Sequence, residues 1–376
     1  MTGGPSLEID LDKITCNAAQ IVQRCQAHNI EVLGVTKGFC ALPQIVNAMV
    51  KGGVKGLADA RLENIAALRS SGFNQHITML RIPRLSRTHQ VVATTNASVN
   101  SELVVVKALS QAWRSGRRVH EIILMVDVGD LREGVMPENV LDTASKISLM
   151  KGVKLAGLGT NMGCFGGVLP SISNLGLLAE LGKDIEYKLG IKLDIISGGG
   201  TSTLRLIDND TIPAGINQVR VGEAILLGTD TTHGQAIPYL SQDAFILKAE
   251  VIEVKSKPSV PIGKVGRNAF GDKPAFQDRG IRKRAIVALG RQDVATDGLS
   301  PLDDRTFILG ASSDHMILDV EESVSEIKVG SHIAFRPNYH GMLNLCNSKY
   351  VNKAYKGGKA WLNSYKESNQ GLLSNL

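Results

Sequence analysis

The chain has 376 residues, of which 43% are apolar and 21% are charged, and a net charge of +6. This length fits a barrel of about 250 residues plus a smaller unit, and the composition excludes a disordered chain. The dense basic cluster Arg279–Arg284 lies inside an otherwise globular stretch, so we expect no nucleic-acid partner.

The cysteines and the N-terminal segment bear on the cell compartment. The five cysteines are odd in number and lack the spacing of a metal or redox site, which indicates reduced thiols. The N-terminal segment MTGGPSLEIDLDKI has no basic stretch followed by an apolar one, and no window approaches 18 uninterrupted apolar residues. We therefore expect a cytoplasmic protein without a metal ion and without a membrane partner.

The first predicted element is the strand in LEIDLDKI, followed by a helical pattern through residue 29. We expect residues 1–30 to join the two domains that follow. From residue 31 to about 228, short β-branched runs alternate with helical patterns, which is typical of parallel strands linked by helices. The predicted strands are Glu31–Thr36, Val54–Ala58, Ile77–Arg81, Ala97–Val99, Glu121–Asp127, Val153–Thr160, Leu193–Ser197 and Gln218–Val221. The helical patterns cover residues 42–51, 60–70, 101–114, 138–149 and 172–189.

Eight such units are the number that closes a (β/α)₈ TIM barrel, which we place at residues 31–235. After residue 236 the sequence changes to shorter β-rich segments between Gly, Pro and Asp turns, which predicts a mostly antiparallel β-domain over residues 236–376. These segments are FILKAEVIEVK, RAIVALGR, TFILGASSDHMILDV and HIAFRPNY. The tail KESNQGLLSNL is predicted to be frayed.

Polar residues recur at the ends of the predicted barrel strands, where enzymes of this fold assemble their active sites. They are Lys37, Asp59, Arg81, Asn100, Asp127, Thr160 with Asn161, Ser197 and Arg220. Any strand that leaves a core must end in something polar, and this structural explanation is as good as a functional one for Asp59, Arg81 and Asn100. It is weaker for Lys37 and Arg220.

Lys37 stands directly after the apolar run EVLGVT. An ammonium near a core is costly unless it is paired or neutralised, and desolvation lowers its pKa. A neutral amine can attack an aldehyde and form a Schiff base. We therefore interpret Lys37 as the lysine that would bind pyridoxal 5'-phosphate.

Two glycine-containing loops support this interpretation, because barrels commonly bind phosphate in the loops after strands seven and eight. The first is Ser197-Gly-Gly-Gly-Thr-Ser-Thr203, and the second is Val219-Arg-Val-Gly-Glu223. An arginine at position 220 that faces the pyridine nitrogen would keep that nitrogen unprotonated, because two cations cannot share a hydrogen bond. The candidate cofactor-binding residues in these loops are Ser197, Gly200, Thr201, Ser202, Arg220, Gly222 and Glu223.

Several longer stretches resemble a known family. LEIDLDKITCNAAQI, EVLGVTKGFC, ILMVDVGDLREGV, LAGLGTNMGCFGG, VRVGEAILLG and ASSDHMILDV resemble, in order and spacing, segments of alanine racemases and other fold-type III pyridoxal-phosphate enzymes. The alanine/ornithine racemase branch is the more similar, through PSVPIG, NAFGDKP, QDRGIRKRAI, GRQDV and GASSDH. The resemblance runs from about residue 6 to residue 350.

The resemblance implies roles for individual residues. Lys37 would be the cofactor lysine and the base on one face of the substrate, and Arg220 would be the partner of the pyridine nitrogen. Arg132 matches an arginine that supports the ring oxygen and the substrate carboxylate. Asn161 stands where those enzymes carry a histidine beside the ring. Asp314 matches a residue near the substrate carboxylate that the partner subunit contributes, so the resemblance also implies a homodimer with shared sites.

The sequence departs from the family at two tyrosines. Where alanine racemases carry the catalytic tyrosine of the opposite face, this chain has Arg291, which we count with Arg132 and Asp314 as a candidate substrate-binding residue. The tyrosine that follows the cofactor lysine by four residues is replaced by Ala41. Racemisation still needs a second proton carrier. The candidates are His315, Tyr339, Tyr350, Asp293 and an activated water, with Cys346 a weaker one.

These observations predict a racemase that interconverts L- and D-amino acids. The resemblance favours ornithine, lysine or arginine as the substrate, followed by alanine and serine. One alternative is a D-amino-acid aldolase, dehydratase or decarboxylase on the same fold. The other is a non-catalytic pyridoxal-phosphate carrier, which the large second domain disfavours.

Overall fold

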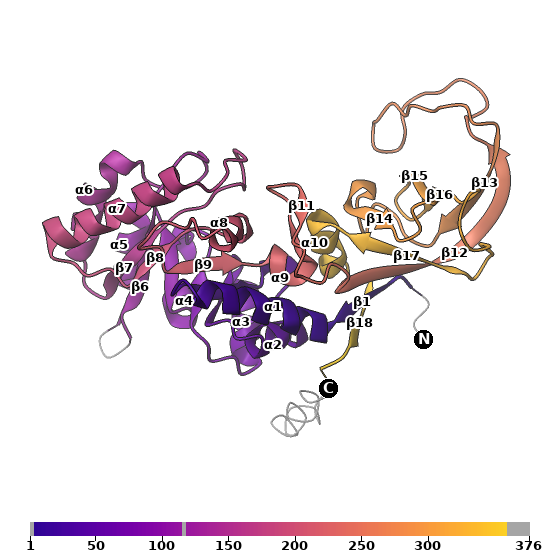
Figure 1. Cartoon of the computed structure of the whole chain (residues 1–376). Helices are drawn as coiled ribbons and strands as arrows, with labels where there is room; N and C mark the ends of the chain where they lie inside the picture. The colour runs from indigo at the N-terminus through magenta and orange to yellow at the C-terminus, as the bar shows by residue number, and fades with distance from the viewer. Residues whose placement is uncertain (1–3, 115–117, 359–376) are drawn as a thin grey trace. The chain divides into compact units, whose positions relative to one another are not determined.

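The computed structural model describes residues 4–114 and 118–358. The predicted frayed tail KESNQGLLSNL lies outside these residues. The chain divides into two compact units, and Figure 1 labels the elements of both. One unit combines the residues up to Asp10 with Asp243–Gly357, and the other is formed mainly by Leu11–Gln242. We describe each unit separately.

The larger unit is built on a closed barrel of eight parallel strands, which confirms the predicted TIM barrel. Strands β2 and β9 close it, with Leu33 opposite Arg220. Its strands are β2 (Glu31–Val35), β3 (Gly56–Asp59), β4 (Ile77–Met79), β5 (Ala97–Asn100), β6 (His120–Met125), β7 (Val153–Gly159), β8 (Ile195–Ser197) and β9 (Gln218–Val221). All eight predicted strands are present, with ends that differ by a few residues.

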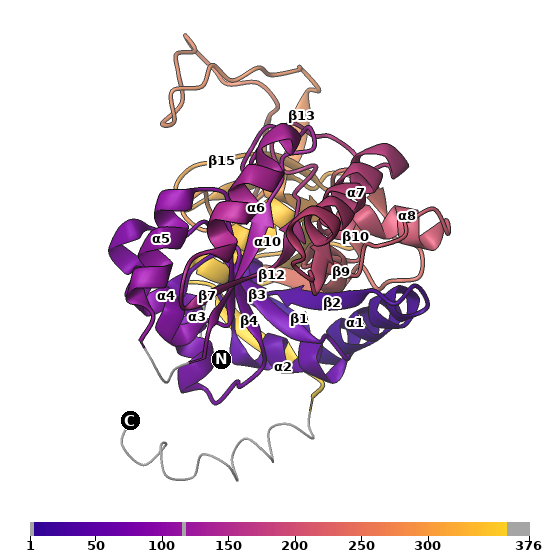
Figure 2. The ribbon, with the colours of Figure 1, turned by 90° about the vertical axis from the view of Figure 1, so that its left-hand side faces the viewer.

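Helices surround these strands (Figure 2). They are α1 (Leu11–Gln26), α2 (Pro43–Lys51), α3 (Leu62–Ser70), α4 (Thr88–Thr94), α5 (Leu103–Ala112), α6 (Val140–Ser148), α7 (Ile172–Leu189), α8 (Leu204–Asp208) and α9 (Glu223–Leu227). Short 3₁₀ helices are η1 (Lys37–Phe39), η2 (Leu85–Arg87), η3 (Pro137–Asn139) and η4 (Thr201–Thr203), and β10 (Thr229–Asp230) pairs with β11 (Gln235–Ala236).

Burial explains why these segments fold as they do. Residues 122–125 of β6 are all 0% exposed, as expected for a strand that is covered on both faces and therefore reads as an apolar run. Helix α7 begins at a capping box formed by Ser171 and Asn174. It ends at Gly190, whose φ of 66° suits a left-handed cap.

The smaller unit is an eight-stranded sheet. Its strands are β1 (Ser6–Asp10), β12 (Phe245–Pro258), β13 (Ile281–Val287), β14 (Leu299–Pro301), β15 (Phe307–Ala311), β16 (Met316–Asp319), β17 (His332–Pro337) and β18 (Asn352–Lys356). Six of them follow the order β14-β17-β12-β13-β16-β15, and β1 pairs with β12 and with β18. Only the β1–β18 pair is parallel in this sheet of the described chain. The unit also holds η5 (Thr296–Gly298) and α10 (Tyr339–Asn347).

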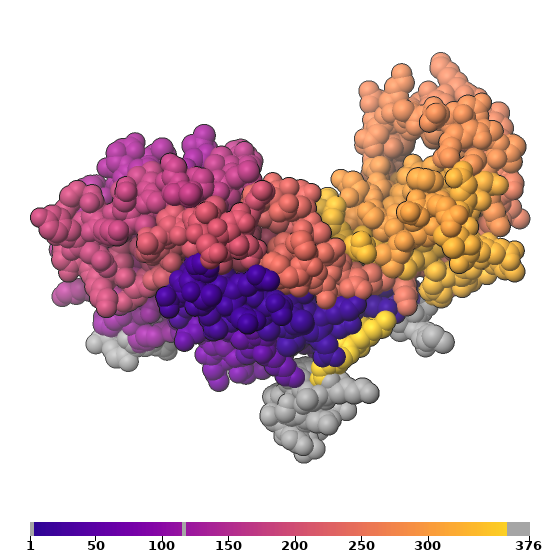
Figure 3. Space-filling view, in the orientation of Figure 1, coloured from indigo at the N-terminus to yellow at the C-terminus, as the bar shows by residue number. Residues whose placement is uncertain are grey.

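The connection between β12 and β13, residues 259–280, stands out from the surface of its unit (Figure 3). Arg291 holds part of it, because its guanidinium pairs with Asp272 at 3.2 Å and lies over the ring of Phe270. Two cations of the basic cluster at the end of this connection are paired, since Asp319 lies 2.9 Å from Arg282 and 3.5 Å from Arg279. No helix in the described part of the chain has the length and apolar character needed to cross a membrane.

Candidate active site

Lys37 is the first residue of η1, directly after β2, at the carboxyl end of the barrel. Thr36, the residue before Lys37, is held in place by a hydrogen bond, in which its hydroxyl donates to Asp59 Oδ2 at 2.6 Å. Asp59 is fully buried and also accepts the backbone N–H of Arg61 at 2.7 Å. Burial raises the pKa of this carboxyl. Asp59 therefore fixes the backbone that presents Lys37, which is a structural role.

The side chain of Lys37 remains accessible, as an amine that must meet a substrate has to be. The surrounding protein nevertheless removes enough water to lower its pKa below 10.5. Arg132 and Arg220 lower this pKa further, whereas Cys164 and Asp59 oppose the shift. A lowered pKa enlarges the fraction of neutral amine, which is the form that acts as a nucleophile or a base.

Arg220 lies on β9 inside the barrel and is 5% exposed. Its Nη1 donates to Ser197 Oγ at 2.5 Å, and its Nη2 donates to the Thr160 carbonyl and to Asn161 Oδ1. Burial lowers its pKa to about 10, so the guanidinium stays charged at neutral pH. Three predicted residues, Thr160 and Asn161 after β7 and Ser197 at the end of β8, are thus brought together around one cation.

A fourth predicted residue joins them through Glu133, which the sequence reasoning did not identify. Asn161 Nδ2 donates to Glu133 Oε1 at 2.5 Å, and Arg132 Nη2 donates to the same oxygen at 2.6 Å. Arg132 Nε also donates to Glu133 Oε2, and this carboxylate raises the pKa of Arg132. A continuous chain of contacts therefore runs from Arg132 through Glu133 and Asn161 to Arg220.

The glycine loop after β8 forms a close-packed cradle with the loop after β9. A Cβ added to Gly200 would come within 3.3 Å of the Arg220 carbonyl oxygen, and one added to Gly222 within 3.1 Å of Val35 Cβ. Thr201 links the two loops, because its Oγ1 accepts the Ala224 N–H at 3.3 Å. Backbone N–H groups in such a loop can approach an anion closely.

The other residues predicted for this cradle differ in what they can offer. Ser202 is buried within η4. The carboxylate of Glu223 accepts hydrogen bonds from Thr229 and Thr231, and burial raises its pKa. Because that carboxylate is engaged with the β10–β11 hairpin, only the backbone N–H of Glu223 is suited to an anion.

The donors in the barrel fit an anionic cofactor that carries an aldehyde and an aromatic nitrogen. Lys37 supplies an amine of lowered pKa, Arg220 a buried cation, and the Gly198–Gly200 loop a backbone cradle. Two further buried atoms at strand ends, Thr160 Oγ1 and Asn100 Oδ1, have no partner among the described residues. In the same described ranges, no three His, Cys, Asp or Glu residues are grouped to hold a metal ion.

The remaining predicted residues belong to the smaller unit, where the backbone N–H of Arg291 donates to the Ser312 carbonyl at 2.9 Å. Asp314 and His315 lie in the exposed turn between β15 and β16, where Asp314 accepts a bond from Gln292 at 3.2 Å. Tyr339 is the first residue of α10, and Tyr350, which follows that helix, is 61% exposed. Asp293 accepts the Ser348 hydroxyl at 2.7 Å.

Known proteins resemble this chain over almost its whole length. Ornithine racemase from Acetoanaerobium sticklandii is 40% identical over 350 residues, which is 93% of this chain and 99% of the relative. Lysine racemase from Thermotoga maritima is 40% identical over 352 residues, which is 94% of this chain and 98% of the relative.

Two further comparisons concern the fold and the family. The crystal structure of alanine racemase from Streptomyces lavendulae superposes with a TM-score of 0.75 at 18% identity, covering 95% of this chain and 98% of that one. At this identity the likeness shows the fold alone. The sequence model of the alanine racemase N-terminal domain matches residues 9–230, more than half of the chain. The protein therefore belongs to the alanine racemase family.

Proposed function

We propose that this protein is a pyridoxal-phosphate-dependent amino-acid racemase that interconverts L- and D-amino acids. The observation that carries the proposal is the cluster of an amine with a lowered pKa, Lys37, and the buried cation Arg220 beside a glycine cradle. The substrates to test first are ornithine, lysine and arginine, because two relatives with 40% identity are an ornithine racemase and a lysine racemase. Alanine and serine follow.

In this proposal the amine of Lys37 would hold pyridoxal phosphate through its aldehyde, with release of water, and Thr201, Ser202 and Gly222 would hold the phosphate. Arg220 would face the pyridine nitrogen, and its own orientation is fixed by Ser197, Thr160 and Asn161. When bound, the cofactor would draw electrons from the Cα–H bond of an attached amino acid and so acidify its α-proton.

The protein's own residues would then move that proton. Once the substrate amine has displaced Lys37 from the cofactor, the free Lys37 Nζ would take the α-proton from one face of the substrate, or deliver a proton to that face. Arg132, oriented by Glu133, binds the substrate carboxylate. A second carrier serves the opposite face, and we propose it from His315, Tyr339, Tyr350 and Asp293, or from a water that one of them activates. Arg291 and Asp314 are proposed to assist in binding the substrate.

We also propose a homodimer in the cytoplasm. The dimer is implied by the family resemblance, and sedimentation of the full-length protein tests it. The cytoplasmic location is supported by five free cysteines, and cell fractionation tests it.

The test of the function is exchange of the α-proton in deuterated water, assayed over the twenty common L-amino acids and ornithine. A racemase exchanges deuterium into its substrate and removes its optical rotation while the substrate's carbon skeleton is conserved. Loss of the skeleton would replace racemisation by cleavage, dehydration or decarboxylation. Cofactor loading without exchange into any amino acid would indicate a carrier.

The cofactor assignment has its own test. Wild-type protein mixed with pyridoxal phosphate should show the absorbance of a lysine-bound cofactor, and borohydride should fix that cofactor to the peptide that contains Lys37. The variant Lys37→Ala should lose both signals. A chromophore that survives in Lys37→Ala would remove the basis of the proposal.

A further inference from the structure

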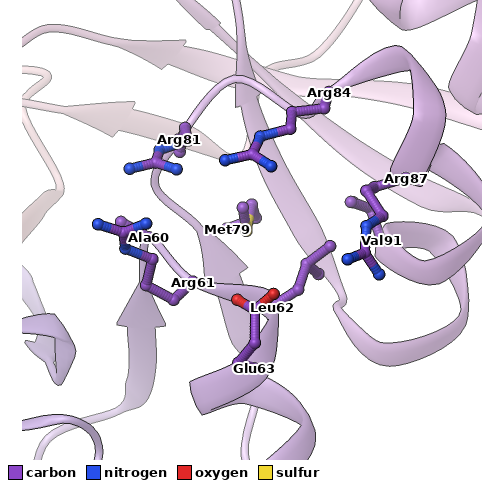
Figure 4. Close-up of a pocket in the computed structure, with 9 residues that line it drawn as sticks. All are labelled: Ala60, Arg61, Leu62, Glu63, Met79, Arg81, Arg84, Arg87 and Val91. Atoms are coloured by element: carbon purple, nitrogen blue, oxygen red, sulfur yellow. The ribbon is translucent and has the colours of Figure 1, made fainter.

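Four arginines gather at the carboxyl ends of β3 and β4, away from the glycine cradle of β8 and β9. Arg61 follows β3, and Arg81, Arg84 and Arg87 follow β4 at three-residue spacing in the segment RIPRLSR. They line a pocket together with one acidic residue, Glu63 (Figure 4). The guanidiniums of Arg81 and Arg84 lie on one side of Met79, and the carboxylate of Glu63 reaches in from the other side.

These arginines lack the carboxylate partners that five other described arginines have. Arg24, Arg132, Arg279, Arg282 and Arg291 each have a carboxylate oxygen within 4.0 Å. Within the described ranges no ion pair reaches any of the four pocket arginines, and the Arg87 side chain bonds only the neutral Gln90 at 2.6 Å. Four guanidiniums thus share a pocket with a single carboxylate. This excess of positive charge favours an anion.

The connection that carries these arginines is held in place by backbone hydrogen bonds rather than by the arginine side chains. The Leu80 N–H donates to the Asp59 carbonyl at 2.8 Å, and the Arg87 N–H donates to the Arg84 carbonyl at 2.9 Å. Met79 and Val91 supply a buried apolar floor. The backbone that carries the arginines is therefore fixed before a ligand binds, which lowers the entropy cost of binding.

The size of the pocket limits what it can accept. Its cavity of about 140 Å³ is smaller than the roughly 300–1,000 Å³ of typical cofactor and drug-sized sites. Guanidinium groups match the oxygens of phosphate through paired N–H donors, and they remain charged throughout the ordinary pH range. Both features favour a small tetrahedral oxyanion with more than one negative charge.

We propose that this pocket is a second anion site that binds a phosphate group, either as inorganic phosphate or as the terminal group of a phosphomonoester. It is separate from the phosphate cradle of the proposed cofactor site, since it is formed by β3, β4 and the residues that follow them. The site is also linked to the backbone next to Lys37. The Arg61 N–H and the hydroxyl of Thr36, the residue before Lys37, both donate to Asp59.

The test is calorimetric titration with inorganic phosphate, at constant ionic strength, of full-length protein that has been loaded with pyridoxal phosphate and then freed of unbound cofactor by gel filtration. The bound cofactor occupies the glycine cradle, and no free phosphomonoester remains to compete, so that the titration reports the arginine pocket. Wild-type protein should bind phosphate saturably. The double variant Arg84→Gln/Arg87→Gln should bind at least about tenfold more weakly, because each substitution removes charge-assisted donors.

Lys107→Gln is the matched control, because it removes an exposed positive charge from α5 without touching the pocket. It should bind phosphate as wild type does. A second titration with methyl phosphate distinguishes the two sources: binding of both ligands assigns a monoester site, and binding of inorganic phosphate alone assigns a free-ion site.

Three results would overturn the proposal. The first is the absence of saturable phosphate binding in wild type. The second is equal phosphate affinity in wild type and the double variant. The third is displacement of phosphate by an equal concentration of chloride, which would indicate an unspecific anion site. A cooperative melting transition without phosphate checks that the double variant is folded. Phosphate should then raise the Tm of wild type and of Lys107→Gln but not that of the folded double variant. None of these readouts depends on racemase activity.

Discussion

At the scale of single residues, Glu133 joins two arginines that the sequence presents as unrelated. It binds Arg132 directly and reaches Arg220 through Asn161. Glu133 is next to Arg132 in the sequence, but the motif DLREGV does not indicate which residues the Glu133 side chain contacts. The chain of contacts orients one cation toward the proposed substrate and another toward the proposed cofactor, so a change at Glu133 should affect both.

Replacing Glu133 by glutamine should lower kcat/KM for the racemase substrate by about tenfold to a hundredfold. The reason is that glutamine keeps a neutral acceptor but loses the charge-assisted bonds to Arg132, which are worth about 1.5–3 kcal/mol. Steady-state kinetics give the change, and absorbance gives the cofactor content, which should be nearly unchanged. Glu138→Gln, an exposed position in the same connection, is the control. Equal kinetics in both variants would refute a positioning role for Glu133.

Lys37 should make the cofactor-free protein less stable at neutral pH than it would be with an uncharged side chain. Its folded pKa lies below 10.5, the value of an ordinary lysine. At a pH below the pKa values of both the folded and the unfolded state, Lys37 is charged in both states. Only the folded state then bears the cost of desolvating the ammonium. As the pH rises through the folded pKa, the folded state loses its proton first and the cost disappears.

Lys37→Met should therefore raise the Tm of cofactor-free protein near pH 7, and this gain should shrink as the pH approaches 10.5. Thermal unfolding over this pH range measures it. Lys107→Met, at an exposed site on α5, should show no such trend. A gain that stays constant with pH would mean that packing, rather than charge, accounts for the effect.

At the scale of elements, the strands of the barrel could be predicted from β-branched apolar runs, whereas four helices, α4, α8, α9 and α10, were not predicted. Helix α4 has the sequence THQVVAT, whose threonines and valines have low helix propensity. Helix α10 contains Gly341, where an added Cβ would lie 2.0 Å from the Gly298 carbonyl oxygen. Its N-terminus is capped by Asn338. Both helices depend on packing that no local pattern reports.

The candidate site was predictable to a similar degree. Lys37 follows β2, Ser197 ends β8 and Arg220 lies near the end of β9, and the order of the strands was enough to bring them to one end of a barrel. Which arginines form ion pairs, however, was not predictable from the sequence. Arg279–Arg284 is the densest basic run in the sequence, yet its Arg279 and Arg282 pair with Asp319, whereas the arginines of RIPRLSR form no ion pair with any described residue. Which arginine meets a carboxylate depends on side-chain contacts between distant segments.

The glycine cradle allows a prediction for the loop as a whole. Gly200→Ala places a methyl group 3.3 Å from the Arg220 carbonyl oxygen, a tight contact that the neighbouring backbone must relieve by a few tenths of an ångström. Overpacking of this kind costs about 1–3 kcal/mol, and we expect cofactor affinity to fall by roughly five- to a hundredfold. Titration of the cofactor by absorbance measures the loss.

Gly176→Ala provides the matched change, because it adds the same methyl group to α7 with nothing within 4 Å. There the substitution should leave cofactor affinity unchanged and stabilise the helix by up to about 1 kcal/mol. If both alanines reduced affinity alike, the cradle would have no special role in holding the cofactor.

At the scale of the whole molecule, the first and last parts of the chain fold together. Strand β1 lies between β12 and β18, with Leu7 opposite Leu247 on one side and Lys353 on the other. The chain then enters the barrel unit at Leu11 and returns to the sheet at Asp243. The barrel is therefore inserted, in sequence, between two pieces of the smaller unit. Folding of the smaller unit must bring together segments more than 200 residues apart, which costs loop-closure entropy.

Leu7 is 0% exposed, and its replacement by alanine should destabilise the sheet unit by about 2–5 kcal/mol through a lost side chain and the cavity left behind. Hydrogen exchange followed by mass spectrometry separates the two units, which a single melting curve does not. Exchange should accelerate in β12, β17 and β18 and remain slow in β6 and β7. Val104→Ala, at a position that is 57% exposed on α5, controls for loss of apolar side-chain carbons and should change neither region by more than about 0.5 kcal/mol. Equal acceleration in β6 and β12 would show that the two units unfold as one, so that β1 stabilises the entire protein.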